Sequence, residues 1–149
     1  CAPGGWTQVA AQIVGNQGKV MGIDTSFVEE ISGAYILKAN IDDDSTVEDI
    51  FSFFGKKINA VISDLSPQVT GNWSVDHSAQ ISLNYTAAKI MEQVLQTKGN
   101  ALFKVFDGEY SNEFYQYMKK KFFKVKLTKP KASRKPSSEL YCICLGFTG

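Results

Sequence analysis

The fold of this chain is decided by one stretch, Asn59-Ala-Val-Ile-Ser-Asp-Leu-Ser-Pro67. Its apolar centre predicts a buried strand over 59–63. The strand runs into Asp64 and then into a proline-containing loop, with Gly71 following. An acid in this position lies at the sheet edge where open α/β folds bind ligands. The alternative is a carboxylate that only caps the loop.

Short apolar runs and amphipathic stretches alternate on both sides of this strand, which is typical of an α/β fold. The other expected strands are 19–23, 34–38, 101–106, 123–127 and 140–147. The expected helices are 6–16, 46–54, 77–97 and 111–121. Ser45 is the expected N-cap of the second helix and Gly55 its end.

Length and composition fit one globular domain. The chain has 149 residues, of which 44% are hydrophobic, so it is not a disordered chain. No apolar run approaches the roughly 18 residues of a membrane span, and no signal-peptide pattern opens the chain, so we expect no membrane partner. Three cysteines make a disulfide framework improbable, and we expect a reducing, cytoplasmic location.

The net charge is +1, but the charges are unevenly spread. Residues 98–135 hold eleven of the sixteen basic residues and three acids, a balance of +8, and the rest of the chain has a balance of −7. This asymmetry favours a surface that meets a polyanion. An ordinary solvated lysine face is the alternative.

The glycine-rich turn Ala2-Pro-Gly-Gly-Trp6 leads into the first expected helix. Such a turn places backbone N–H groups beside a ligand. Because it ordinarily follows a strand, we expect the first, central strand of the sheet to lie outside this sequence. Asp24, about twenty residues on, stands where an acid accepts hydrogen bonds from a ribose. A plain turn and a loop acid are the alternatives, but together the two features favour a nucleoside cofactor.

Lys104 interrupts the apolar run Leu102-Phe-Lys-Val-Phe106. A lysine is costly to bury unless it has a partner or a task. Desolvation would lower its pKa and make it a candidate general base, whereas a lysine that reaches solvent at the sheet end is the alternative. Glu139 could pair with Lys104 if the final strand lies alongside.

Other chemistries find little support. His77 is the sole histidine, so neither a zinc site nor a Ser/His/Asp triad is expected. Pro-Gly-Gly-Trp lacks the Gly-x-Gly-x-x-Gly spacing of an NAD-binding oxidoreductase.

In this order the motifs resemble the FtsJ/RrmJ family of S-adenosylmethionine-dependent RNA 2′-O-ribose methyltransferases, over almost the entire chain. The motifs are Ala2–Trp6, Ser63–Pro67 with Gly71, Phe103–Phe106 with Gly108-Glu109, Lys129-Pro130 with Ser133-Arg134, and Ser138–Tyr141. The resemblance implies one methyltransferase domain over 1–149, truncated at its N-terminus. Its fold would be a Rossmann-like sheet with helices on both faces and an antiparallel last strand.

The family's catalytic set is a Lys-Asp-Lys-Glu tetrad. The resemblance assigns its acid to Asp64, its second lysine to Lys104 and its glutamate to Glu139, and places the first lysine upstream of this sequence. Lys104 would take the proton of a ribose 2′-hydroxyl, and the two acids would orient the groups. In-line methyl transfer of this kind needs no metal.

The cofactor is expected to be S-adenosylmethionine, with S-adenosylhomocysteine as product. The resemblance implies that Gly4 and Trp6 contact it from the turn, that Asp24 binds its ribose, and that Asp64 serves both cofactor and catalysis. Asn40 stands where the family often has an aspartate near the adenine.

The expected partner is RNA, bound by basic side chains through its phosphates. These are Lys119–Lys121, Lys124, Lys126, Lys129, Lys131, Arg134 and Lys135. The leading hypothesis is a monomer that methylates a uridine ribose of large-subunit (23S-type) ribosomal RNA. A tRNA anticodon-loop enzyme, a cap-directed mRNA enzyme and a silent RNA-binding assembly factor are the alternatives. Gly5 favours the ribosomal branch, since the tRNA branch usually has serine there.

Overall fold

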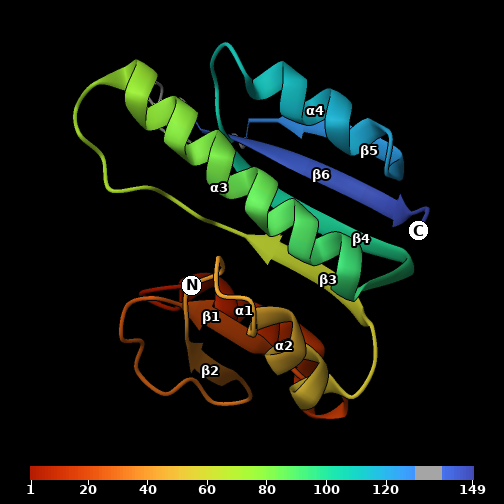
Figure 1. Ribbon diagram of the computed structural model, residues 1–149. Coiled ribbons are helices and arrows are strands. Elements are labelled where there is room, and N and C mark those ends of the chain that lie inside the picture. The colour runs from red at the N-terminus through yellow and green to blue at the C-terminus, as the bar shows by residue number, and fades with distance from the viewer. Residues whose placement is uncertain (130–138) are drawn as a thin grey trace. The chain divides into compact units, whose positions relative to one another are not determined.

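The computed structural model describes residues 1–129 and 139–149 (Figure 1). The chain forms two compact units, Cys1–Lys56 and Lys57–Gly149, and each contains its own sheet. The α/β alternation expected from the sequence is present in both units.

The first unit contains a small parallel sheet with two helices. Its elements are α1 (Gly5–Val14), the short 3-10 turn η1 (Gly15–Gln17), β1 (Met21–Asp24), β2 (Tyr35–Lys38) and α2 (Thr46–Phe54). The pairing of β1 with β2 runs from Met21 opposite Tyr35 to Asp24 opposite Lys38. Parallel pairing puts the carboxyl ends of both strands at the same edge.

Helix α2 has the predicted bounds and the predicted residues at both caps. Gly55 ends it in the left-handed conformation, with φ of +71°. Ser45 occupies the predicted N-cap position, but its side chain makes no cap hydrogen bond. The reason is local: the preceding residues already form a turn, in which the N–H of Thr46 donates to the carbonyl of Asp43 at 3.0 Å.

The second unit contains a mixed four-stranded sheet with two helices. Its elements are β3 (Ile58–Ser63), α3 (Trp73–Val94), β4 (Leu95–Phe106), α4 (Ser111–Lys119), β5 (Phe122–Thr128) and β6 (Glu139–Phe147). The strand order is β3-β4-β6-β5. β3 and β4 are parallel, whereas β6 runs antiparallel to β4 and β5, which confirms the expected direction of the last strand.

Helix α3 corrects the sequence prediction at both ends. It begins at Trp73, four residues earlier than expected, because the side chain of Asn72 accepts hydrogen bonds from two N–H groups of the first turn. It ends at Val94, because Leu95 pairs with Ile58 and begins β4. Lys98 has φ of +67° at the irregular start of that strand and does not end a helix.

The core of the second unit lies between its sheet and helices α3 and α4, which both cover one face of the sheet (Figure 1). The helices contribute Ile81, Ala88, Met91, Phe114 and Met118, and the sheet contributes Phe103, Val105, Cys142 and Cys144. The two sulfurs are 3.7 Å apart without a bond, as expected for alternating positions on one strand. Contact with Cys142 and burial raise the pKa of Cys144, so this thiol is a packing group.

Within residues 1–129 and 139–149, no helix is long and apolar enough to cross a membrane.

Candidate active site

Lys104 and Asp64 form an ion pair where β3 ends. Ser63 is the last residue of β3 and lies beside Phe103 of β4, so Asp64 and Lys104 follow at the same edge of the sheet. The Nζ of Lys104 lies 2.8 Å from Oδ1 of Asp64 and 3.2 Å from the carbonyl oxygen of the same residue. Lys104 is only 7% exposed, so its partner is this acid and not solvent.

Two amide side chains of α3 hold the backbone of β4 where β3 no longer pairs with it. The carbonyl of Lys104 accepts hydrogen bonds from Gln80 at 2.8 Å and from Asn84 at 2.9 Å. The N–H of Phe106 donates to Oε1 of Gln80 at 3.1 Å. Both amides are fully buried and replace the missing strand partner. Sequence reasoning missed them, although their i, i+4 spacing on the core side of a helix was visible.

Strand β6 brings Glu139 and Tyr141 to the same face of the sheet. Tyr141 lies opposite Lys104, and Glu139 lies opposite Phe106. Burial raises the pKa of Tyr141, and the negative charges of Glu139 and Asp64 raise it further, so both carboxylates act on this phenol. The expectation that the final strand lies alongside Lys104 is therefore confirmed. Tyr141 was not predicted as a site residue, although it closes the Ser138–Tyr141 motif.

The first unit brings the glycine turn and Asp24 together. Gly4 has φ of +114°, and a Cβ there would lie 2.6 Å from Cδ1 of Ile31, so the turn accepts only glycine. The Asp24 carboxylate accepts hydrogen bonds from the N–H of Ala2 at 2.6 Å and the N–H of Ser26 at 2.8 Å. These two backbone donors hold the carboxylate in place beside the glycine turn.

Trp6 and Asn40 are the other two residues of the first unit that were predicted to bind the cofactor. Trp6 is the second residue of α1 and is half-buried. Asn40 is exposed and follows β2, at the same edge as Asp24. Its Oδ1 accepts a hydrogen bond from the N–H of Asp42 at 3.1 Å, so this oxygen already orders the loop.

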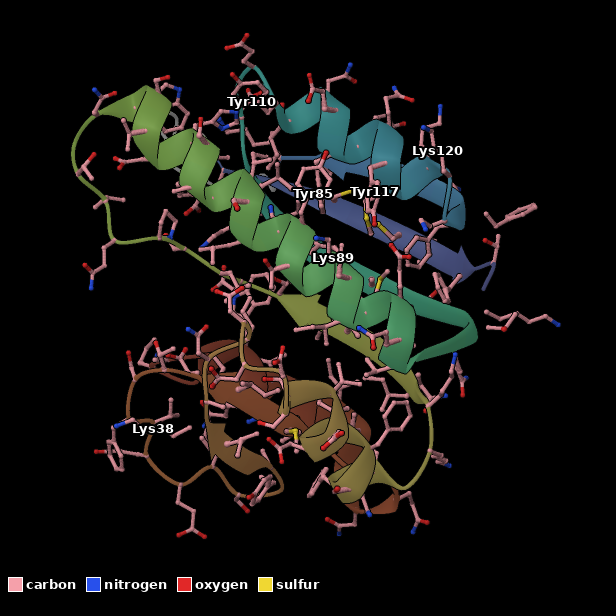
Figure 2. The ribbon with its side chains drawn as sticks, in the orientation of Figure 1. Lys38, Tyr85, Lys89, Tyr110, Tyr117 and Lys120 are labelled. Atoms are coloured by element: carbon pink, nitrogen blue, oxygen red, sulfur yellow. The ribbon has the colours of Figure 1, made fainter. Side chains whose placement is uncertain are left out.

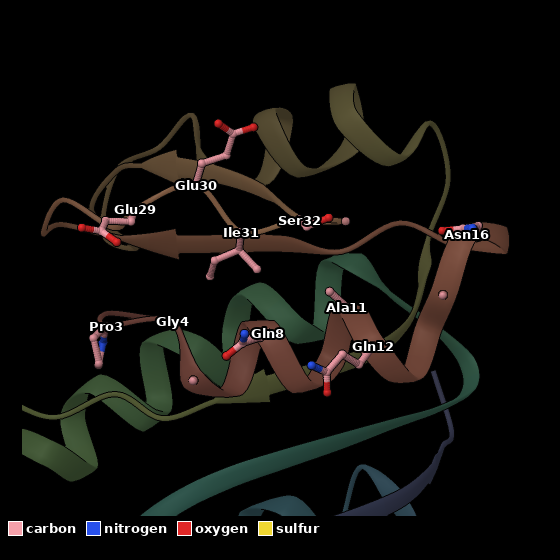
Figure 3. Close-up of a pocket in the computed structure, with 13 residues that line it drawn as sticks. Pro3, Gly4, Gln8, Ala11, Gln12, Asn16, Glu29, Glu30, Ile31 and Ser32 are labelled. Atoms are coloured by element: carbon pink, nitrogen blue, oxygen red, sulfur yellow. The ribbon is translucent and has the colours of Figure 1, made fainter.

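A cavity of about 580 Å³ lies in the first unit between α1 and the loop 29–33 (Figure 3). Its lining includes Gly4, Gln8, Gln12 and Ile31. Trp6, Asp24 and Asn40 are not part of the lining. The cavity therefore shares only Gly4 with the residues predicted to bind the cofactor.

His77 is a packing residue in this structure. It is 3% exposed, and its Nε2 accepts a hydrogen bond from the N–H of Tyr110 at 3.1 Å. Among the residues that the structure describes, no three His, Cys, Asp or Glu side chains are grouped so that they could hold a metal ion.

The two units differ in the sign of their net charge. The second unit holds 13 basic and seven acidic residues, a balance of +6, whereas the first holds three basic and eight acidic residues, a balance of −5. Lys119, Lys120, Lys124 and Lys126 are exposed. Lys121 is half-buried against Glu92, with Nζ 2.8 Å from Oε2. Lys131, Arg134 and Lys135 lie outside the described residues.

A model of one protein family, the FtsJ-like methyltransferases, matches residues 1–147. The chain belongs to the FtsJ-like methyltransferase family. The family predicted from the sequence motifs is therefore confirmed.

Two curated relatives of this FtsJ-like methyltransferase are both named "Ribosomal RNA large subunit methyltransferase E". The one from Nitrosopumilus maritimus is 67% identical over 149 residues, which cover 100% of this chain and 76% of the relative. The one from Methanocaldococcus jannaschii is 41% identical over 157 residues, covering 100% of this chain and 63% of the relative.

Solved structures confirm the predicted fold class. A crystal structure described as a ribosomal RNA methyltransferase from Plasmodium falciparum matches 100% of this FtsJ-like chain and 84% of its own, with a TM-score of 0.89 and 29% identity. A protein from Clostridium thermocellum described as an rRNA methylase matches with a TM-score of 0.59 and 18% identity, covering 100% and 84% of the two chains. At that identity the second match shows the fold alone.

Proposed function

We propose that this FtsJ-like methyltransferase transfers a methyl group from S-adenosylmethionine to the 2′-oxygen of a uridine ribose in large-subunit ribosomal RNA. The observation that carries the proposal is the ion pair of the buried Lys104 with Asp64, with Glu139 on the neighbouring strand β6. The names of the curated relatives support the same substrate class.

The first unit offers residues that fit the cofactor. Gly4 has a positive φ that favours glycine, and a turn of this kind before a helix can present backbone N–H groups to a ligand. Asp24 uses each carboxylate oxygen for a backbone N–H, but a carboxylate has about four acceptor sites, so it keeps capacity for ribose hydroxyls. Trp6 and Asn40 would contribute contacts to the nucleoside. In the second unit, Asp64 would serve the cofactor as well as catalysis.

The protein's task in this reaction is to position two substrates and move one proton. When bound, S-adenosylmethionine supplies a methyl group already activated by a positive sulfur, which reacts by in-line displacement. With its amine deprotonated, Lys104 would accept a hydrogen bond from the ribose hydroxyl and take its proton as the oxygen bonds to the methyl carbon. Asp64 fixes the lysine, and Glu139 would orient the hydroxyl from β6. Much of the rate enhancement would come from this positioning.

The RNA would meet the second unit, whose balance of +6 suits a phosphate backbone. Lys119, Lys120, Lys124 and Lys126 would contact phosphates, and affinity would fall steeply with salt. The proposal also includes a single methyltransferase domain over 1–149, action as a monomer and a cytoplasmic location.

In the test, the protein with its natural N-terminus receives methyl-labelled S-adenosylmethionine together with large ribosomal subunits, protein-free ribosomal RNA or tRNA in parallel. The label is then located by nuclease mapping, and Lys104→Ala protein serves as the blank. Label on a ribose 2′-oxygen of the large-subunit RNA is the expected result. Label in tRNA alone would favour the alternative of a tRNA anticodon-loop methyltransferase. No label from a protein that binds the cofactor would overturn the proposal in favour of a silent scaffold.

A further inference from the structure

The second unit contains a column of aromatic rings beside the Lys104 ion pair. Trp73, the first residue of α3, stacks on His77 with ring centroids 6.0 Å apart and planes 17° apart. It also stacks on Phe106, at 5.9 Å and 23°. His77 in turn stacks on Tyr110, at 5.6 Å and 8°. The four rings are thus nearly parallel.

Trp73 is the most exposed ring of this column. His77 is 3% exposed and Phe106 is 8% exposed, whereas Trp73 is 47% exposed. A large part of the indole surface is therefore accessible to another flat ring, of the kind that stacks on aromatic side chains.

The loop before Trp73 is fixed. Asp76 is 5% exposed and its carboxylate accepts hydrogen bonds from the N–H and the hydroxyl of Thr70, at 2.7 and 2.8 Å, and from the N–H of Gly71, at 3.1 Å. The Asn72 side chain caps the helix. The indole is held ready in one place before any ligand arrives, which reduces the entropy cost of binding.

The indole lies at the end of the strand that carries the proposed catalytic lysine. Phe106, on which the indole stacks, is two residues beyond Lys104 on β4, and side chains two apart on a strand share a face. Two steps along a strand span roughly 7 Å. A group stacked on Trp73 would therefore lie at the same end of β4 as a ribose held at Lys104.

We propose that Trp73 is a stacking platform for an unpaired base of the RNA substrate, next to the nucleotide whose ribose Lys104 receives. Proteins that recognise unpaired RNA stack its splayed-out bases on aromatic side chains. An exposed aromatic ring in a unit with a balance of +6 suits such a ligand. The inference rests on the proposed function for its choice of RNA. The competing occupant, a segment of protein that covers the ring, is an outcome of the test.

The first experiment uses the indole itself as the probe. The chain has two tryptophans, so a Trp6→Phe variant leaves Trp73 as its sole indole. Single-stranded RNA of about ten nucleotides, a length within the usual site size, is compared with an abasic ribose-phosphate chain of equal length. We expect the RNA to quench the fluorescence of Trp73 and the abasic chain to bind without quenching it. Equal quenching by both, or none by either, would overturn the inference.

The second experiment measures the dissociation constant of the same RNA. Stacking of one base contributes about 1–3 kcal/mol, so Trp73→Ala should weaken binding roughly 5- to 150-fold. Trp73→Phe should restore most of the affinity. The matched control is Val75→Ala, which removes another exposed apolar group of the same helical turn, 51% exposed, and should change nothing. Loss of affinity for RNA and the abasic chain alike would show a structural role.

Salt dependence and catalysis separate this inference from the proposed function. Trp73→Ala should leave the slope of log Kd against log salt unchanged, because no phosphate contact is lost. In methyl transfer it should raise the KM for RNA more than it lowers kcat. If RNA quenches the fluorescence of Trp73 but the wild-type protein methylates none of the RNAs, the proposed function is wrong and the stacking platform stands. If the Trp73→Ala protein methylates RNA fully and its KM for RNA is unchanged, the stacking platform is wrong and the proposed function stands.

Discussion

The ammonium of Lys104 and the carboxylate of Asp64 form an ion pair just beyond the last residue pair of the parallel strands β3 and β4. The lysine side chain is 9% exposed and the aspartate side chain 36% exposed, so the pair has a buried cation and an acid that reaches the surface. This arrangement suits a group that must meet a substrate from a protected position.

Replacing Lys104 by alanine should abolish methyl transfer and leave affinity for S-adenosylmethionine nearly intact. General bases contribute about 10²–10⁴-fold, so kcat should fall at least a hundredfold. Labelled methyl transfer and titration calorimetry provide the two readouts. Lys89→Ala, which removes an exposed lysine from α3, is the matched control (Figure 2). Undiminished turnover in Lys104→Ala would remove its assigned role.

Replacing Gln80 by alanine should lower both stability and methyl transfer. The change leaves the N–H of Phe106 without its partner and takes one of two donors from the carbonyl of Lys104. A buried group left without a partner costs about 1–3 kcal/mol, measurable by urea unfolding. Gln93→Ala, an exposed amide of the same helix, should cost far less. Equal stability losses in the two variants would contradict the role given to Gln80.

Replacing Asp24 by alanine should weaken the binding of S-adenosylmethionine. A hydrogen bond to a charged group contributes about 1.5–3 kcal/mol, so the dissociation constant should rise roughly 10- to 150-fold. Titration calorimetry measures it directly, with Asp44→Ala as the exposed-acid control of the same unit. An unchanged dissociation constant would remove Asp24 from the cofactor site.

The cluster of Glu92, Lys121 and Tyr117 should make stability depend on pH at both extremes. Burial acts to raise the pKa of Glu92, but hydrogen bonds from Lys121 and Tyr117 outweigh it and lower the pKa below 4.5. A lowered folded-state pKa stabilises above about pH 4.5, and this contribution is lost as the pH falls. Burial and Glu92 raise the pKa of Tyr117 from 10.0 to about 12, so its contribution is present below pH 10 and is lost as the pH rises towards 12.

Circular dichroism of urea unfolding between pH 3 and pH 12 tests this dependence. Glu92→Gln should cost about 1 kcal/mol at pH 7, a value set by a partly exposed ion pair, and should flatten the loss of stability on the acid side. Glu113→Gln, an exposed acid of α4, is the control. The same acid-side slope in wild type and Glu92→Gln would show that this cluster does not contribute.

Local sequence was sufficient for most elements and for the family. Gly55 ended its helix where predicted, because glycine adopts positive φ at little cost. Asp64 was expected to end a strand because an apolar run stopped there. These predictions succeeded because each depends on neighbours within a few residues.

Predictions that depended on distant partners were the ones that failed or were missed. Leu95 continues the helical pattern of α3, and only its pairing with Ile58 makes it the first residue of a strand. In the sequence, Gln80 and Asn84 look like ordinary polar positions of a helix. Their role follows only from the end of β3, which leaves the backbone at Lys104 without a strand partner.

The sequence by itself determined the α/β alternation, the glycine turn and the residue types of the proposed catalytic set, because spacing and composition act along the chain. Only the tertiary structure decided that Lys104 pairs with Asp64, that Tyr141 lies opposite Lys104, and that Trp73 is the most exposed ring of an aromatic column. These relationships depend on strand register and on helix packing, which join residues 30 to 80 positions apart. Contacts between residues so far apart produce no hydrophobic periodicity, so a single sequence does not predict them.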